Sequence, residues 1–444
     1  MKSARPNCKN RILLSRKSAK TQKRLNISHR FLLTIFFCAF LTVPLYSQRL
    51  ELFGYYEPQL MGAQFGEKYY NVASNKVRLD VSKSWSNINF GANVNYITYH
   101  GKTDWNLLEY LPQKISDQIP GMMHEYFTFH FGDLVQWSGP LALPRPDRIF
   151  LDNAFARIRY KSADITIGKQ QLNMGAGYTW NPTDFFNVKD VLDPTYEQTG
   201  HNAIRLELAL HPGFSIDSYF SPGEELKDSG AMIKLKSNVG HFDISVLGIR
   251  NYWLRSDILN PSAILNPDAA LSTYRRQMIG GDLVGELLGL GVWAEGGYTF
   301  LDLEEGAGVP DVDDFWEIVL GLDYTFKSGL YLMGEFYHNS SLPKNWQDYT
   351  LNHWLRYFTT ETRAMSRDNF FGLVQYPLTD LITVGGMVIQ SISDGSAAVA
   401  PMLTWSMFQD VELLSYINMN TGQEGQAYAA NLGSGGIVRL RIYF

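Results

Sequence analysis

Hydrophobic and polar residues alternate along most of the chain after residue 47. In the carboxyl-terminal segment, Val438, Leu440 and the terminal Phe444 share one face, whereas Arg439 and Arg441 share the other. A period of two residues is that of a β-strand, and one apolar face opposite a charged face suits a strand between lipid and a wet lumen. An amphipathic edge strand of a soluble sandwich has the same local pattern, so the rest of the chain must decide between the two.

The alternating segments predict 18 strands, and a division into 16 also fits. The predicted strands span residues 50–63, 72–85, 88–99, 153–161, 164–172, 202–210, 213–221, 229–237, 241–252, 276–287, 290–301, 314–326, 329–339, 368–377, 381–392, 396–406, 410–419 and 435–444. After residue 47 no apolar run reaches the length of about 20 residues that a spanning helix needs. We therefore expect an all-β protein.

The connections between these strands alternate in length. Every second one is a tight turn, as at Ser86-Asn87 and Leu288-Gly289. The others are mostly long, including residues 100–152, 173–201 and 340–367, and the short connection 393–395 is an exception. A soluble sandwich has no reason to sort its loops in this way, whereas membrane barrels have short periplasmic turns and long extracellular loops. The pattern predicts a transmembrane antiparallel β-barrel.

The amino terminus has the layout of a secretory signal peptide. Residues 1–30 hold ten Lys and Arg but no Asp or Glu, and an apolar run follows from Phe31 to Leu45. We predict a signal peptide at residues 1–47 and a barrel at 48–444. An anchoring helix is the alternative, but about 15 apolar residues are short for one.

Signal cleavage changes the chemistry available to the mature chain. Cys8 and Cys38 are both removed, which leaves no thiol for a disulfide, a nucleophile or a metal site. Loss of the ten basic residues leaves 29 Lys and Arg against 44 Asp and Glu, a net charge of −15. This charge argues against nucleic acid as a partner.

Three short stretches and the carboxyl terminus resemble a known family. The stretches are Gly168-Lys169-Gln170, Asn181-Pro182-Thr183-Asp184 and Glu197-Gln198-Thr199-Gly200. They resemble a pattern in porin-like barrels of the Gram-negative outer membrane and, less closely, in alginate-export and capsule-assembly barrels. Met174-Gly175 departs from the usual Trp-Gly pair. The resemblance implies an 18-strand type of barrel with an inward-folded loop, surrounded by outer-membrane lipid and lipopolysaccharide. The terminal Phe444 resembles the signal that the barrel-assembly machinery reads.

Two long loops are candidates for restricting the lumen. In residues 173–201, Pro182 fixes a turn whose flanking Asn and Asp cap local backbone groups, so this segment has a purely structural reading. The functional reading places four charged residues in contact with solute: Lys169, Asp184, Lys189 and Asp190. The 53 residues of 100–152 are rich in aromatic residues, and we interpret them as a plug or constriction, with folding on the outer surface as the alternative.

Six basic residues on predicted strands have the positions of a lumen ladder. They are Arg157, Arg159, Lys169, Arg205, Arg439 and Arg441. Such a ladder attracts anions. The alternative, which the acidic mature chain favours, is that these cations pair with lumen carboxylates such as Glu207 and Asp217. Together with Asp184, the six cations and Glu207 are the predicted pore-lining residues.

Catalytic chemistry has little support in the sequence. His338, with neighbouring Asn339 and Ser340, is the best candidate for a barrel lipase, which requires a Ser–His pair on neighbouring strands. The acidic loop 302–313 lacks the spacing of an EF-hand and has a simple reading as a solvated loop. We therefore expect no enzyme activity, catalytic residue, metal or cofactor.

These observations favour an outer-membrane channel. The predicted function is passive diffusion of small hydrophilic solutes, gated by inward-folded loops. A barrel that exports or anchors an extracellular polysaccharide is the alternative. An enzyme barrel and a soluble secreted β-protein are weaker readings. Solute identity and oligomeric state stay open.

Overall fold

The computed structural model describes residues 50–65, 68–106, 111–117, 130–131, 135–136, 142–187, 189, 192, 196–223, 226–256, 271–305, 313–358 and 361–444. The predicted signal peptide at 1–47 lies outside the described residues, and so does the core of the acidic loop 302–313. Within the described part of the chain, no helix is long and apolar enough to cross a membrane.

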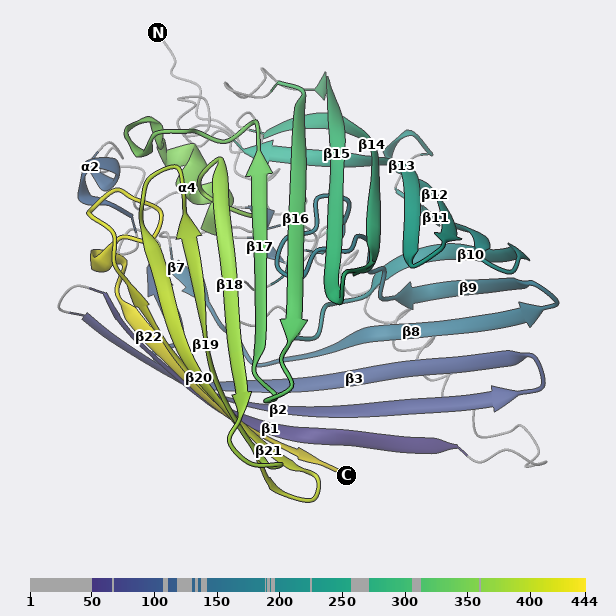
Figure 1. Cartoon of the computed structure of the whole chain (residues 1–444), viewed down its shortest axis with the longest axis horizontal. Helices are drawn as coiled ribbons and strands as arrows, with labels where there is room; N and C mark the ends of the chain where they lie inside the picture. The colour runs from purple at the N-terminus through teal and green to yellow at the C-terminus, as the bar shows by residue number, and fades with distance from the viewer. Residues whose placement is uncertain are drawn as a thin grey trace, which may run out of the picture. The chain divides into compact units, whose positions relative to one another are not determined.

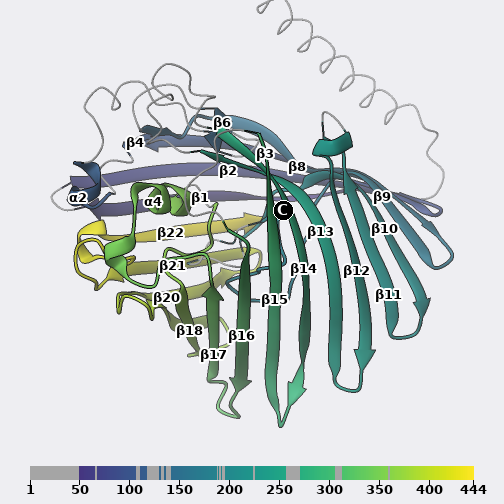
Figure 2. The ribbon, with the colours of Figure 1, turned by 90° about the horizontal axis from the view of Figure 1, so that it is seen from above.

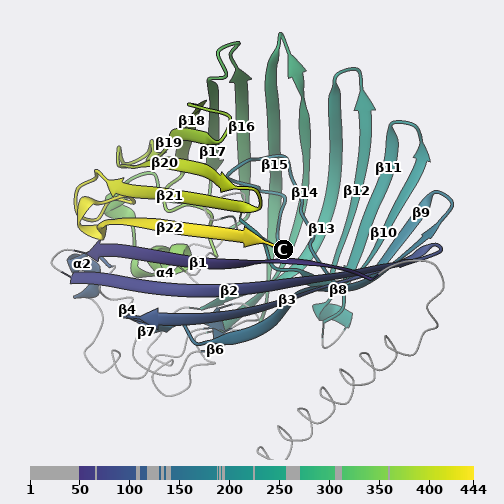
Figure 3. The ribbon, with the colours of Figure 1, turned by 90° about the horizontal axis from the view of Figure 1, so that it is seen from below.

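Eighteen antiparallel strands form one closed barrel in which β1 pairs with both β2 and β22 (Figure 1). The strands are β1 (Glu51–Phe65), β2 (Lys68–Trp85), β3 (Ile88–Gly101), β8 (Arg148–Tyr160), β9 (Ala163–Gln170), β10 (His201–His211), β11 (Phe214–Ser221), β12 (Gly230–Val239), β13 (Phe242–Ser256), β14 (Leu271–Leu287), β15 (Leu290–Glu305), β16 (Phe315–Thr325), β17 (Tyr331–Asn339), β18 (Asp368–Pro377), β19 (Ile382–Ser391), β20 (Ala397–Phe408), β21 (Val411–Asn420) and β22 (Ser434–Tyr443). Figures 2 and 3 show consecutive strands side by side around the wall.

The remaining elements lie in the long connections. Two small two-stranded antiparallel sheets pair β4 (Asp104–Asn106) with β7 (Ala142–Pro144) and β5 (His130–Phe131) with β6 (Val135–Gln136). The helices are α2 (Gln113–Ser116), α4 (Leu351–Phe358) and the 3-10 turns η2 (Leu226–Asp228), η5 (Trp346–Asp348) and η6 (Ala430–Leu432). We call the end of the barrel with these connections the loop end, and the opposite end the turn end.

All 18 predicted strands are confirmed, and the 16-strand division is wrong. Several strands are longer than the alternation predicts. For example, β13 and β14 stay paired as far as Ser256 and Leu271. Tight turns at the turn end use positive φ angles, for example at Ser86 (53°) and Leu288 (56°). Such left-handed turn residues match the right-handed twist of the paired strands.

Side chains of the wall alternate between the outer surface and the lumen. In β16, Trp316, Ile318 and Leu320 are exposed outward, whereas Glu317 and Val319 are buried inward. The outward apolar face is the one that lipid would contact, and the inward face carries the polar groups. This alternation confirms the two faces that the sequence pattern predicts.

Part of the lumen is filled by an apolar core. Inward residues of β16–β20 pack against the connection 340–367, which includes α4, and against Trp180 of the connection 171–200. Leu351, Trp354 and Leu355 of α4 are buried in this core, and Leu111 and Ile115 also belong to it. The long connections at the loop end therefore pack inside the barrel.

A charge on the outward face of β16 tests the lipid-facing assignment. Replacing Leu320, midway along this strand, with Arg should lower the free energy of unfolding in lipid vesicles by about 2–4 kcal/mol, because the bilayer centre penalises a cation. Urea titration followed by tryptophan fluorescence measures the change. Leu381→Arg, in the turn between β18 and β19, is the control and should cost less than about 1 kcal/mol. Equal costs at both positions would contradict the assignment.

Candidate functional site: a loop fixed across the lumen

The connection 171–200 is held by its own Asn-Pro-x-Asp turn. The buried Asp184 carboxylate accepts hydrogen bonds from the backbone N–H groups of Phe186 (2.9 Å) and Asn187 (3.0 Å) and from that of Met174 (3.3 Å). Burial raises the pKa of the Asp184 carboxyl, although these N–H groups oppose the shift. Asp184 therefore stabilises the loop, which supports the structural reading of this segment.

Two carboxylates of the barrel wall bind the backbone of this loop. Glu295 of β15 accepts hydrogen bonds from the N–H groups of Ala176 (2.6 Å), Gly177 (2.9 Å) and Thr183 (2.7 Å). An irregular segment lacks the internal hydrogen bonds of a helix or sheet, so its buried N–H groups need such partners. Glu295 is the acceptor for three of these N–H groups, and it also accepts a hydrogen bond from the Thr183 hydroxyl at 2.8 Å.

Glu335 of β17 makes a second, equivalent set of bonds. Its carboxylate accepts from the backbone N–H groups of Tyr178 (2.5 Å), Thr179 (2.8 Å) and Trp180 (3.0 Å) and from Trp293 Nε1 (2.8 Å). Both glutamates are buried. The loop is therefore fixed to the inward faces of β15 and β17 by these hydrogen bonds.

The end of the loop binds a different part of the wall, formed by β1, β2 and β22. Glu197 accepts a hydrogen bond from Tyr55 at 2.6 Å and pairs with Lys76 at 2.9 Å and Arg78 at 2.6 Å. The neighbouring Tyr196 hydroxyl donates to Glu57 at 2.9 Å. We call Tyr196 and Glu197, together with these wall partners, the latch. Burial raises the pKa of Glu197. The charge of Lys76 and the hydrogen bonds from Tyr55 and Lys76 lower it by more than burial raises it, so the pKa is below its ordinary value.

A third contact joins this loop to the connection 340–367. Trp180 Nε1 donates to the carbonyl of Arg363 at 3.2 Å, and the Arg363 guanidinium donates to the carbonyl of Asp184. Arg363 also pairs with Glu317 of β16 at 3.4 Å. The sequence pattern of 340–367 indicates only a long loop, so its role inside the barrel is a finding of the structure.

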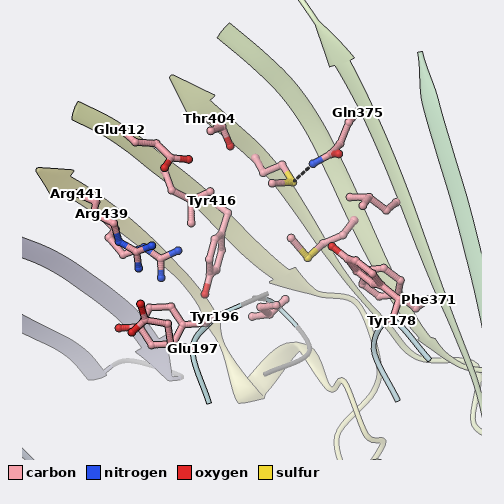
Figure 4. A pocket seen from close by; sticks show the side chains of 15 residues that line it. Tyr178, Tyr196, Glu197, Phe371, Gln375, Thr404, Glu412, Tyr416, Arg439 and Arg441 are labelled. Atoms are coloured by element: carbon pink, nitrogen blue, oxygen red, sulfur yellow. Dashed lines mark hydrogen bonds between the residues drawn. The ribbon is translucent and has the colours of Figure 1, made fainter. Parts of the chain in front are cut away.

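A cavity of about 360 Å³ lies between the latch and the wall of β18–β22 (Figure 4). Its polar lining consists of Glu197, Gln375, Thr404, Glu412, Arg439 and Arg441. Its apolar and aromatic lining consists of Tyr178, Leu192, Tyr196, Phe371, Leu373, Met387, Met402, Leu414 and Tyr416. Figure 4 shows Arg439 and Arg441 reaching from β22 toward Tyr196 and Glu197.

Two of the predicted pore-lining residues line this cavity. Arg441 pairs with Glu57 at 2.5 Å, and Arg439 lies 3.8 Å from the same carboxylate. The Arg439 guanidinium also lies over the Tyr196 ring, 4.8 Å from its centroid. Both arginines therefore contact the latch as well as the cavity.

The other predicted cations do not form one ladder. Arg205 pairs with Asp217 (2.6 Å) and Glu207 (3.1 Å), as the alternative reading expects. Exposed Arg159 pairs with Asp164 next to the tight turn, at 3.0 Å.

Arg157 and Arg205 both lie opposite Thr166 of β9 in the sheet register. Lys169 is three positions further along β9, on the other face of the strand with the exposed Ile167. Lys169 is therefore not in one row with Arg157 and Arg205, because strand alternation puts positions an odd number apart on opposite faces.

Sequence reasoning missed the residues that fix the loop. Glu57, Lys76, Glu295 and Glu335 are charged residues at inward positions of strands whose outward positions are apolar. That pattern marks them as lumen residues, but nothing local shows that a loop more than a hundred residues away binds them. Of the predicted plug 100–152, residues 107–110, 118–129, 132–134 and 137–141 lie outside the described residues.

Among the described residues, no hydrogen bond joins the His338 ring to Ser340. His338 Nδ1 lies 2.6 Å from Asp368 Oδ1. The His338 ring stacks on the outward-facing Trp316, with 4.2 Å between the ring centroids. The neighbouring Ser340 hydroxyl accepts the backbone N–H of Trp316 instead. Within the same residues, no group of three His, Cys, Asp or Glu side chains has the arrangement of a metal site.

Comparisons with known proteins identify the fold. No protein-family model and no curated protein matches the sequence. OccAB4 of Acinetobacter baumannii superposes with a TM-score of 0.51 at 10% identity, covering 89% of this chain and 97% of OccAB4. OccK11 of Pseudomonas aeruginosa superposes with a TM-score of 0.48 at 9% identity, covering 89% of this chain and 95% of OccK11. The trimer form of OmpT, an outer membrane protein of Vibrio cholerae, superposes with a TM-score of 0.44 at 9% identity. The superposition covers 90% of this chain and 100% of OmpT. The likeness to OccAB4 concerns the fold, a closed antiparallel β-barrel.

The bonds of Glu335 to the loop backbone are open to a direct test. Glu335→Gln should speed hydrogen exchange at the amides of Tyr178, Thr179 and Trp180 by roughly tenfold or more, because bonds to a charged acceptor contribute about 1.5–3 kcal/mol. Mass spectrometry of peptides from the loop measures the exchange. Glu207→Gln removes a lumen carboxylate that pairs with Arg205 and should leave these amides unchanged. Unchanged exchange in Glu335→Gln would refute the anchoring role.

The latch should be sensitive to acid. Because the folded protein lowers the pKa of Glu197 below its ordinary value of 4.5, ionised Glu197 stabilises the latch above about pH 4.5. This contribution is lost as the pH falls through the lowered pKa. Limited proteolysis of the loop from pH 6 to pH 3 should show protection that declines below pH 4.5 in the native protein. In Glu197→Gln the protection at pH 6 should already be weak, and an unaltered profile would contradict the role of the latch.

Proposed function

We propose that the barrel is an outer-membrane channel for passive diffusion of small hydrophilic solutes, restricted by the connections 171–200 and 340–367. The observation that carries this proposal is the fixing of residues 171–200 to two separate parts of the lumen wall, at Glu295 and Glu335 and at the latch. A segment held in this way narrows the passage without closing the barrel by itself. Selection then depends on the size of the solute that passes beside it.

The charges in the lumen support weak rather than strong ion selection. Arg205 and Arg441 each pair with wall carboxylates, and Lys76 and Arg78 pair with Glu197. Paired charges present a small net field to a passing solute. The mechanism we infer is size exclusion with minor charge selection and no chemical step.

The outer surface supports insertion in the outer membrane after export by the predicted signal peptide. Its partners would be outer-membrane lipid and lipopolysaccharide. The terminal Phe444 exchanges backbone hydrogen bonds with Gly54 of β1, at 2.9 and 3.0 Å, so the residue proposed to be read by the assembly machinery lies at the seam of the barrel. Delivery of the final strand to this seam would complete closure.

A second function keeps one observation in its favour. The apolar core between β16–β20 and the connection 340–367 occupies lumen space that an open pore would leave to water. A barrel sealed in this way suits surface anchoring or export of an extracellular polysaccharide, in which the barrel opens only with its cargo. Electrical conductance separates the two functions.

Conductance of residues 48–444 refolded in detergent and inserted in a planar bilayer tests the channel. Stepwise openings with a small reversal potential in a salt gradient are expected. Glu197→Ala should raise the single-channel conductance roughly twofold or more, because release of the latch widens the passage.

Asp164→Ala, which removes a carboxylate near the turn end that pairs with Arg159, is the matched control and should conduct like the native protein. Heat-modifiable gel mobility shows that each variant is folded. A folded, inserted and silent barrel would overturn the channel and favour the polysaccharide function.

A further inference from the structure

The cavity beside the latch changes character along the barrel axis. On β18, polar Gln375 lies near the turn end, and Leu373 and Phe371 follow deeper in the barrel. On β21, Glu412 is followed in the same direction by Leu414 and Tyr416. The lining is therefore polar toward the turn end and mostly apolar toward the middle of the barrel, with Arg439 of β22 beside Leu414.

The neighbouring strand β20 repeats the gradient. Thr404 lies toward the turn end, and Met402 lies one inward position deeper. Met387 of β19 completes the apolar part, and the Tyr178 ring lies 5.9 Å from the Phe371 ring on its far side. An aqueous pore has polar inward positions, so an apolar floor at this depth requires another explanation. Cavities of a few hundred Å³ with mostly apolar walls and a few polar groups are typical of small-molecule sites.

The polar part of the cavity is balanced in charge. Arg439 and Arg441 share the buried Glu57 carboxylate, and Glu412 adds a second negative charge beside Arg441 in the sheet register. Glu197 is already paired with Lys76 and Arg78. With arginine, threonine and glutamine as donors and glutamate, threonine and glutamine as acceptors, this part suits a head group that both donates and accepts hydrogen bonds.

We propose that this cavity is a binding site for an amphipathic solute with an apolar body and an uncharged, hydroxyl-bearing head. The body lies against Phe371, Met387 and Met402, and the head lies near Thr404, Glu412 and Arg441. The solute enters from the turn end, because the apolar core closes the deeper side at Phe371, Leu373 and Met387. Flexible methionine side chains adapt to bodies of different shape. The site deepens the proposed channel function by naming a solute class, and its occupancy does not require conduction.

Binding to the full mature chain in lipid nanodiscs tests the site without a conductance measurement. The probe is 4-nitrophenyl β-D-glucoside, followed by isothermal titration. It should bind at least about tenfold more tightly than glucose, which has the same head and no apolar body. The charged probes phenylacetate and phenethylammonium should both bind more weakly than the glucoside. Equal binding of glucose and the glucoside, or tighter binding of either charged probe, overturns the proposal.

Two substitutions of similar shape locate the site. Met402→Gln and Leu414→Asn each make the apolar part of the cavity more polar. Each should weaken binding of the glucoside by about three- to tenfold and leave binding of glucose unchanged. Two variants are used so that one remains informative if the other misfolds. Met419→Gln, at an exposed outward position of β21, is the control and should bind as the native protein does. Native affinity in both folded floor variants refutes the site, whereas a silent barrel that binds the glucoside refutes only the open channel.

Discussion

Pairing between β1 and β22 closes the sheet, and the rest of the structure depends on that closure. In lipid an unpaired backbone group costs several kcal/mol, so a spanning sheet is stable only when it has no free edge. The seam is set by Gln59 opposite Arg439 and by the mutual bonds of Gly54 and Phe444. Closure also brings Glu57 of β1 beside the arginines of β22. Residues from the two ends of the mature chain therefore share one side of the lumen.

A barrel of this width leaves space that side chains of the wall alone do not fill. Residues 171–200 enter that space without regular secondary structure, so their N–H groups must find acceptors away from bulk water. The buried carboxylates of Glu295 and Glu335 accept six backbone N–H groups between them. A buried carboxylate is itself costly unless it is hydrogen-bonded. Loop and wall therefore satisfy each other, and this mutual need fixes the position of the loop.

Restriction and recognition follow from the same arrangement. The latch places Tyr196 and Glu197 on one side of the cavity, and the apolar core places Phe371 and Tyr178 on the other. A solute that passes the loop therefore meets both a balanced set of charges and an apolar surface. Movement of the latch would change the width of the passage and the shape of the cavity together, because Tyr196 belongs to both.

The structure decided between 18 strands and 16, whereas the sequence by itself determined where the strands lie along the chain, their lumen and lipid faces and the sorting of short turns from long loops. These depend on a two-residue period and on turn chemistry, which are local properties. Only the tertiary structure decided the partners, such as Arg205 with Asp217 and Glu197 with Lys76. Partner choice depends on strand register and on where a loop folds inside the barrel. Both are set by contacts between residues far apart in the chain, which no local pattern records.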